Sequence, residues 1–145
     1  MLLKRHSQKI DVLKSVPLLG TMSRRHLDLI ARHADEVSVP AGKVLARQGG
    51  LCREFFIVLD GRASVEQNGK RIATVRKGEM VGEMSLIDNK PRVATVTAET
   101  PMTLLVIESR SFGVLLDDVP ELRKKVLVTL CERLRAANAK LAMMN

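Results

Sequence analysis

The sequence predicts an α+β fold that is mainly β: a small barrel or jelly roll flanked by N-terminal helices and a C-terminal helical pair. Residues 1–35 and 111–145 carry apolar side chains at helical spacing, whereas 36–107 consists of short β-type segments separated by glycine-marked turns. The chain has 145 residues, the length of one domain, so we expect residues 1–145 to form a single domain.

The N-terminal helical region is interrupted in its middle. Pro17 and Gly20 are helix-breaking residues, and they end the first helical pattern. Ser23 then has the short hydroxyl side chain of an N-cap residue. The residues after it that recur at helical spacing are Leu27, Ile30 and Ala34. We therefore expect a second helix to begin directly after Ser23.

The central region has the pattern of some seven short strands. Segments 63–67 and 72–75 are separated by Asn68 and Gly69. An Asn-Gly pair between β segments is the strongest short hairpin signal, because both turn residues need a positive φ. The other segments with strand character are 37–39, 55–59, 92–98 and 102–107.

Pro120 fits the first turn of a last helix that runs to the C-terminus. The apolar residues of this helix alternate in spacings of three and four, which is a heptad seam: Leu127, Leu130, Leu134, Ala137, Leu141 and Met144. Such a seam packs on the chain's own barrel or pairs with a second chain, and the two arrangements can coexist. The sequence leaves both open.

The positive charge does not by itself indicate nucleic-acid binding. The formal net charge is +8, from 24 Lys and Arg against 16 Asp and Glu, but the excess is spread along the chain. Only three aromatic residues are present, all phenylalanine in apolar surroundings, so the chain lacks the aromatic platforms on which bases stack. We therefore expect a solvated basic surface rather than a face that binds nucleic acid.

Other classes of protein are excluded by what the sequence lacks. Its longest apolar run, 55–59, is far shorter than the roughly 18 residues of a membrane span, and no signal peptide is recognisable, so we expect a cytoplasmic protein without a membrane partner. Cys52 and Cys131 form no metal-binding pair, and we expect no metal and no cofactor. No nucleophile triad, P-loop or dinucleotide fingerprint is present, so we expect no enzyme.

The stretch 81–96 carries the features of an anion site. Gly82 permits a tight bend and the close approach of a ligand, and the residues after it suffice for one helical turn whose first amides point outward. Glu83 can accept a hydrogen bond from a sugar hydroxyl, and the guanidinium of Arg92 can hold two phosphate oxygens. The residues alone allow a phosphate-plus-ribose pocket or a structural Glu–Arg ion pair.

This stretch resembles the phosphate-binding cassette of the cyclic nucleotide-binding domain, which the catabolite activator family and the protein kinase A regulatory subunits share. The pattern G-E-x-[AS]-L, a turn, then P-R-x-A-[ST]-V is matched by Gly82, Glu83, Ser85, Leu86, Pro91, Arg92, Ala94, Thr95 and Val96. The resemblance covers nearly the whole chain. It implies the jelly-roll-like cyclic nucleotide-binding β-roll over 36–107, with its cassette at 81–96, between N-terminal helices (1–35) and closing helices (111–145).

The resemblance also implies the residues of the ligand site. Glu83 would accept from the ribose 2′-hydroxyl, Arg92 would hold the cyclic phosphate, and backbone amides would complete the anion nest. The implied cassette residues are Gly82, Glu83, Met84, Ser85, Arg92, Val93 and Ala94. Several family members have Ser or Thr where this chain has Val93, and the missing hydroxyl favours cAMP over cGMP.

Two residues of the last helix complete the implied site. By ungapped spacing from Arg92, Arg133 falls near the Glu and ribose region, and Asn138 falls at the purine edge, where an amide both donates and accepts. For both residues the alternative is a solvated position on the helix.

The resulting hypothesis is a cyclic nucleotide sensor module that couples the binding of cAMP, or alternatively cGMP, to movement of its C-terminal helix. The chain ends at Asn145, about sixty residues short of a winged helix-turn-helix, so we expect a stand-alone module. It would dimerise through 122–144 and act on a protein partner in signal transduction. The alternatives are a reduced or truncated transcription regulator of the catabolite activator type, and a degenerate domain that serves as an interaction module.

Overall fold

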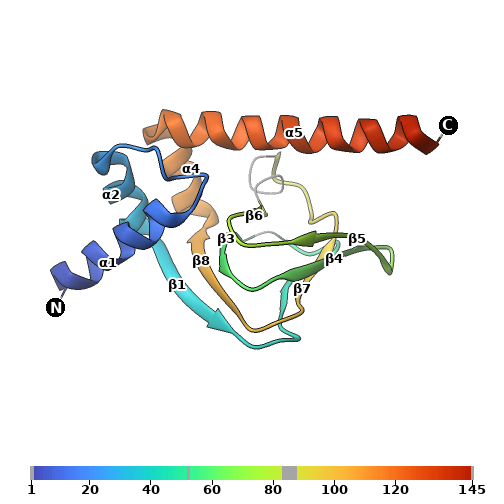
Figure 1. Ribbon diagram of the computed structural model, residues 1–145, viewed down its shortest axis with the longest axis horizontal. Helices are drawn as coiled ribbons and strands as arrows, with labels where there is room; N and C mark the ends of the chain where they lie inside the picture. Colours follow the sequence, from blue (N-terminus) through green and yellow to red (C-terminus); the bar gives the residue numbers. More distant parts are fainter. Residues whose placement is uncertain (1, 52, 83–87, 145) are drawn as a thin grey trace.

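The computed structural model describes residues 2–51, 53–82 and 88–144. Two four-stranded antiparallel sheets form a β-roll, three helices gather at one end of the roll, and a fourth long helix runs over it (Figure 1). The predicted mainly β roll between N-terminal helices and a C-terminal helical pair is therefore confirmed.

The two N-terminal helices are α1 (Leu2–Ser15) and α2 (Arg24–His33). The break between them falls where Pro17 and Gly20 predicted it. Ser23 caps α2, because its hydroxyl accepts a hydrogen bond from the backbone N–H of His26 at 3.3 Å. The sequence prediction of this helix start is confirmed.

The first sheet has the order β1 (Ala34–Val39), β8 (Met102–Glu108), β3 (Glu54–Asp60) and β6 (Met80–Val81). The second sheet has the order β2 (Val44–Ala46), β7 (Thr95–Ala98), β4 (Ala63–Gln67) and β5 (Lys70–Val75). The two strands for which the sequence predicted no segment are β2 and β6, which are 3 and 2 residues long. Segments this short show no detectable period, and their pairing with β7 and β3 makes them strands.

The predicted Asn-Gly hairpin joins β4 to β5. Asn68 has φ 54° and Gly69 has φ 77°, so both turn residues adopt the positive φ on which the prediction rests.

The strand predicted over 92–98 is shorter than expected and begins at Thr95. The backbone of Arg92 is instead paired with the turn after β2. The Gly49 N–H donates to the Arg92 carbonyl at 2.7 Å, and the Arg92 N–H donates to the Gly50 carbonyl at 2.9 Å. This local pairing replaces the continuation of β7.

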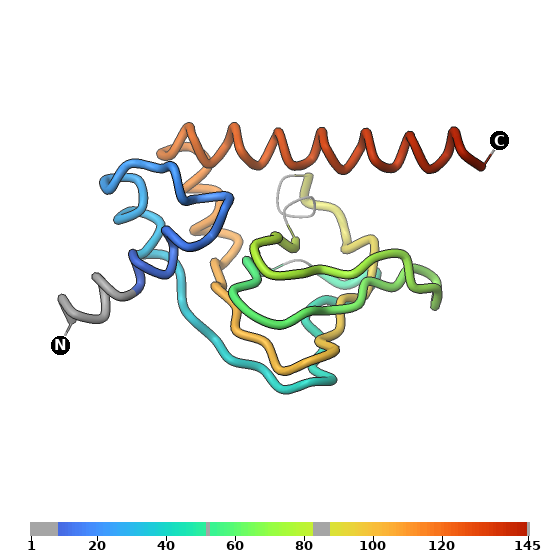
Figure 2. The backbone as a smooth tube through the Cα atoms, in the orientation of Figure 1, coloured from blue at the N-terminus to red at the C-terminus, as the bar shows by residue number. Residues whose placement is uncertain are grey.

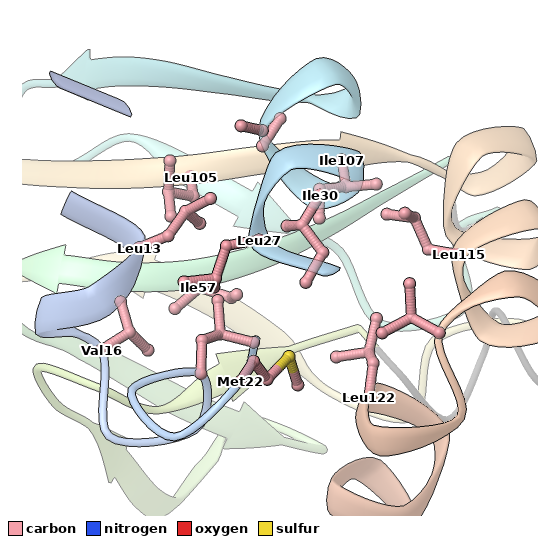
Figure 3. Close-up of a cluster of buried hydrophobic side chains, with 14 of the residues drawn as sticks. Leu13, Val16, Met22, Leu27, Ile30, Ile57, Leu105, Ile107, Leu115 and Leu122 are labelled. Carbon is pink, nitrogen blue, oxygen red and sulfur yellow. The ribbon is translucent and has the colours of Figure 1, made fainter. Parts of the chain in front are cut away.

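The apolar run in β3 faces two different cores, because successive side chains of a strand point to opposite faces. Phe55 and Ile57 pack against the helices, where the ring of Phe55 stacks on that of Phe112 with centroids 4.5 Å apart. Figure 3 shows this core between the first sheet and the helices. Phe56 and Val58 face the interior of the roll. The first sheet is thus buried on both faces, which explains why 55–59 is continuously apolar.

The C-terminal pair consists of α4 (Ser109–Asp118) and α5 (Pro120–Met144). The predicted start of α5 at Pro120 is confirmed. Its first turns are anchored in the helical core by Leu122 and Val126, which are 2% and 1% exposed. The rest of α5 extends over the second sheet (Figure 2), and residues 134–144 are all exposed.

The heptad seam of α5 is largely uncovered. Leu127, Leu134 and Leu141 are 55%, 62% and 60% exposed. The roll therefore covers only a small part of the apolar side chains of this seam. None of the helices in the described part of the chain is both long and apolar enough to span a membrane.

Candidate functional site

A cavity of about 530 Å³ lies between the second sheet and α5, and we call it the α5 cavity. Its walls are mainly aliphatic, with side chains from both the sheet and the helix. The apolar lining includes Ala46, Val65, Ile72, Val75, Val81, Val93 and Val96, and the charged lining residues are Glu79, Arg92, Arg133 and Lys140. An apolar pocket with a few convergent charged groups suits a ligand that combines an apolar ring with an anionic group.

Arg92 lines this cavity as a buried cation. Only 8% of it is exposed. One terminal nitrogen, Nη2, donates to the backbone carbonyl of Glu54 at 2.9 Å, and the guanidinium carbon lies 5.9 Å from the centroid of the Phe56 ring. Among the residues that the structure describes, no carboxylate forms an ion pair with it. A negative charge stabilises a buried cation, so a buried guanidinium that lines a cavity suits a site that receives an anion.

Gly82 provides the space in which the guanidinium lies. Its φ of +96° is strained for any residue with a side chain. A Cβ at this position would lie 2.9 Å from the Glu54 carbonyl oxygen and 3.0 Å from Nη1 of Arg92. The groups that lie against Gly82 in the structure are the Glu54 carbonyl and the Arg92 guanidinium, and the predicted close approach of a ligand to Gly82 stays a prediction.

The backbone before and after Arg92 is held by the turn that follows β2. Besides the two hydrogen bonds of Gly49 and Gly50 with Arg92, the Gln48 N–H donates to Thr95 Oγ1 at 3.0 Å. The Gln48 side chain also exchanges hydrogen bonds with Asn68, both at 2.8 Å. This support connects the hairpin turn to the arginine and was missed by sequence reasoning, because no local pattern signals it.

The other predicted cassette residues that the structure describes also lie at the α5 cavity. Val93 is 56% exposed and Ala94 is 8% exposed, and both line the wall. Glu83, Met84 and Ser85 lie outside the described residues, so their predicted roles stay predictions.

One face of α5 covers the cavity. Arg133 lines it and donates from Nη2 to the Met80 carbonyl at 2.7 Å, which joins the helix to β6. The other lining residues of α5 are Ala136, Ala137 and Lys140. These follow Arg133 at i+3, i+4 and i+7, the spacing of a single helix face.

Asn138, predicted at the purine edge, is exposed and is not among the residues that line the cavity. It follows Arg133 by five residues, which rotates it by about 140° around the helix. Its predicted contact with a base stays a prediction. Lys140 was missed by sequence reasoning, although the helical period counted from Arg133 would have indicated it.

Comparisons with known proteins agree with this geometry. A family model described as the cyclic nucleotide-binding domain matches residues 36–118. Among curated proteins, the chain is 33% identical over 115 residues to the cAMP-dependent protein kinase regulatory subunit of Schizosaccharomyces pombe, covering 79% of this chain and 28% of the relative. It is 32% identical over 123 residues to a cyclic nucleotide-gated potassium channel of Rhizobium etli, covering 85% of this chain and 34% of the channel.

The chain thus spans about a third or less of the length of these two relatives. Solved structures agree in fold. Cyclic AMP-bound PfPKA-R superimposes with a TM-score of 0.82 and 28% identity, over 98% of this chain and 49% of that one. The catabolite activator protein of Thermus thermophilus superimposes with a TM-score of 0.78 and 26% identity, over 88% of this chain and 62% of that one.

Proposed function

This chain belongs to the cyclic nucleotide-binding domain family, and we propose that it is a sensor module that binds cAMP in preference to cGMP in the α5 cavity. The observation that carries the proposal is Arg92, a buried guanidinium that lines the cavity and forms no ion pair with a described carboxylate. A cyclic phosphate would bring a negative charge to this buried cation, and a guanidinium binds two phosphate oxygens with matched geometry.

The remaining walls support a base and a ribose. The aliphatic side chains of the second sheet offer an apolar surface to a purine, as Val65, Ile72 and Val75 do on one side of the cavity. The lining residue Val93 offers no hydroxyl, which is the reason for proposing cAMP over cGMP. The residues that we propose to act on the phosphate and ribose besides Arg92 are Gly82, Glu83, Met84, Ser85 and Ala94, with Glu83 accepting from the ribose. We propose no cofactor and no catalytic step.

Ligand binding in this cavity would act on α5. Only the first turns of α5 are buried in the helical core, and Arg133 bonds to the Met80 carbonyl beside the cavity. A ligand that contacts Arg133 and the face that continues to Lys140 adds contacts to one position of the helix and thereby shifts its population toward that position. Movement of α5 would in turn change the surface presented to a protein partner.

We further propose that α5 pairs with a second copy of the chain. Leu127, Leu134 and Leu141 recur at heptad spacing and are each more than half exposed. A row of large apolar side chains on a single helix face is stabilised by covering it, and an equivalent α5 offers a complementary row.

Replacing Arg92 by methionine separates binding from folding. We expect Arg92→Met to weaken cAMP binding about 100-fold, because about 2–3 kcal/mol of charge-assisted hydrogen bonding is lost. The free energy of unfolding should stay within about 1 kcal/mol of the unsubstituted protein or rise, because a buried charge is removed and the apolar stem is kept. Isothermal titration and urea unfolding measure the two quantities. Arg110→Met, at an exposed position, is the control and should bind cAMP with the affinity of the unsubstituted protein. If the Arg92 variant also binds cAMP with unchanged affinity, the proposal is contradicted.

Nucleotide preference is tested at Val93. Val93→Thr adds a hydroxyl at a cavity position that is 56% exposed, so folding should be unaffected. We expect cGMP affinity to rise about tenfold, roughly one hydrogen bond to a polar ligand, with cAMP affinity little changed. Val93→Ala is the control because it removes apolar volume without adding a hydroxyl. If both variants gain the same affinity for cGMP in titrations, the hydroxyl argument is wrong.

The proposed action on α5 is tested by hydrogen exchange. Saturating cAMP should slow deuterium uptake over residues 133–141, because the ligand adds contacts on the cavity side of the helix. Arg133→Ala should reduce this protection. Arg135→Ala removes an exposed arginine that does not line the cavity and should preserve it. Unchanged uptake in α5 at saturating cAMP would refute the coupling while leaving the binding proposal standing.

Pairing through α5 is tested by light scattering. The unsubstituted chain should have twice the 16.1 kDa mass of one copy, and Leu134→Asp with Leu141→Asp should reduce the mass to that of a monomer, because charges are placed in the seam. Val114→Asp, at a position outside α5 that is 45% exposed, should remain a dimer. A monomeric mass for the unsubstituted protein at high concentration would overturn the pairing.

A further inference from the structure

We propose that a second concave surface, which shares Arg92 with the α5 cavity, binds a small molecule that carries a polyphosphate group. This surface, which we call the basic groove, has a volume of about 640 Å³. Its charged lining residues are Lys43, Arg47, Arg53, Glu54 and Arg92. Among these five, only Arg92 also lines the α5 cavity, and the two concavities share one apolar residue, Ala46. The groove therefore adjoins the first site at Ala46 and Arg92, and its remaining lining is its own.

The charge of the basic groove is strongly one-sided. Among the described residues that line it, four carry cationic side chains and one, Glu54, carries a carboxylate. Lys43, Arg47 and Arg53 are exposed, and none of the three forms a side-chain hydrogen bond or an ion pair with any residue that the structure describes. Like charges that gather in a concavity repel one another, and they focus a positive potential there. A bound anion would offset the repulsion between the cations and would itself be stabilised by their positive potential.

The backbone elements that carry these cations are held in place. Lys43 and Arg47 flank β2, which is registered on β7 by the pairs Val44↔Thr97 and Ala46↔Val96. The turn after β2 is bound to the backbone of Arg92 by the two hydrogen bonds of Gly49 and Gly50. Arg53 directly precedes β3, a central strand of the first sheet. The cations therefore converge from both sheets, and little backbone ordering remains to be lost when a ligand binds.

Charge and size together indicate the class of ligand. The excess of three positive charges matches a diphosphate or triphosphate better than a single phosphate. The volume is in the range of small-molecule sites, which exceeds what one phosphate group occupies. Arg47 and Arg53 add guanidinium groups, whose planar forks suit phosphate oxygens. The wall is less aliphatic than that of the α5 cavity, which fits a ligand recognised through its phosphates.

Inorganic tripolyphosphate is the probe, because it has the proposed charged group without a base or sugar. Isothermal titration at about 150 mM salt screens distant surface charges while leaving the groove intact. We expect saturable binding by the unsubstituted protein and at least a tenfold loss of affinity in the double variant Arg47→Gln with Arg53→Gln. Lys43→Gln removes only one charge from the same groove, so we expect it to lower the affinity for tripolyphosphate about threefold.

Two controls show where the probe binds. The double variant Arg25→Gln with Arg110→Gln removes the same charge from exposed positions outside the groove and should bind normally. Arg133→Gln changes only the α5 cavity and should also bind normally. No saturable binding by the unsubstituted protein, equal losses in both double variants, or a larger loss in the Arg133 variant than in the groove variants would each overturn the proposal. No cyclic nucleotide is added, so the result is independent of the function proposed above.

Discussion

The site depends on the accommodation of one buried guanidinium. Arg92 is enclosed by the Glu54 carbonyl, the ring of Phe56 and the bare backbone of Gly82. None of these groups carries a negative charge, and no carboxylate in the described part of the chain forms an ion pair with the guanidinium. Such an arrangement is costly for folding and valuable for binding, because an incoming anion meets a desolvated and oriented partner.

The rest of the roll is built in a way that supports this position. β3 contributes Phe55 to the helical core and Phe56 to the roll interior, so the strand that contacts the guanidinium is packed on both faces. The turn at Gly49 and Gly50 binds the backbone of Arg92 directly. The arginine is thus fixed by β3, by the turn after β2 and by the bend at Gly82, although these lie far apart in the sequence.

The two ends of the long helix α5 are held differently. Leu122 and Val126 bind its start to the helical core, whereas its later turns rest on the molecule through Arg133 and the cavity face. Regions with few buried apolar contacts open locally at a lower free energy than a packed core, so the extension is held less firmly than the base. Leu134 and Leu141 of its uncovered leucine row lie on this same extension, which is why we propose that the cavity and the partner contacts of α5 are coupled.

What the sequence by itself determined is local. The dihedral preferences of Asn68 and Gly69 dictate a hairpin, the hydroxyl of Ser23 dictates a helix start, and the motif around Arg92 identifies the family before any fold is known. Contacts between distant segments were decided only by the tertiary structure. The pairing of Arg92 with the turn after β2 shortened the predicted strand, and the rotation of α5 brought Lys140 to the cavity rather than Asn138. The reason is physical: backbone preferences act over a few residues, whereas the phase of a helix over a sheet and the enclosure of a charge depend on how separate elements pack.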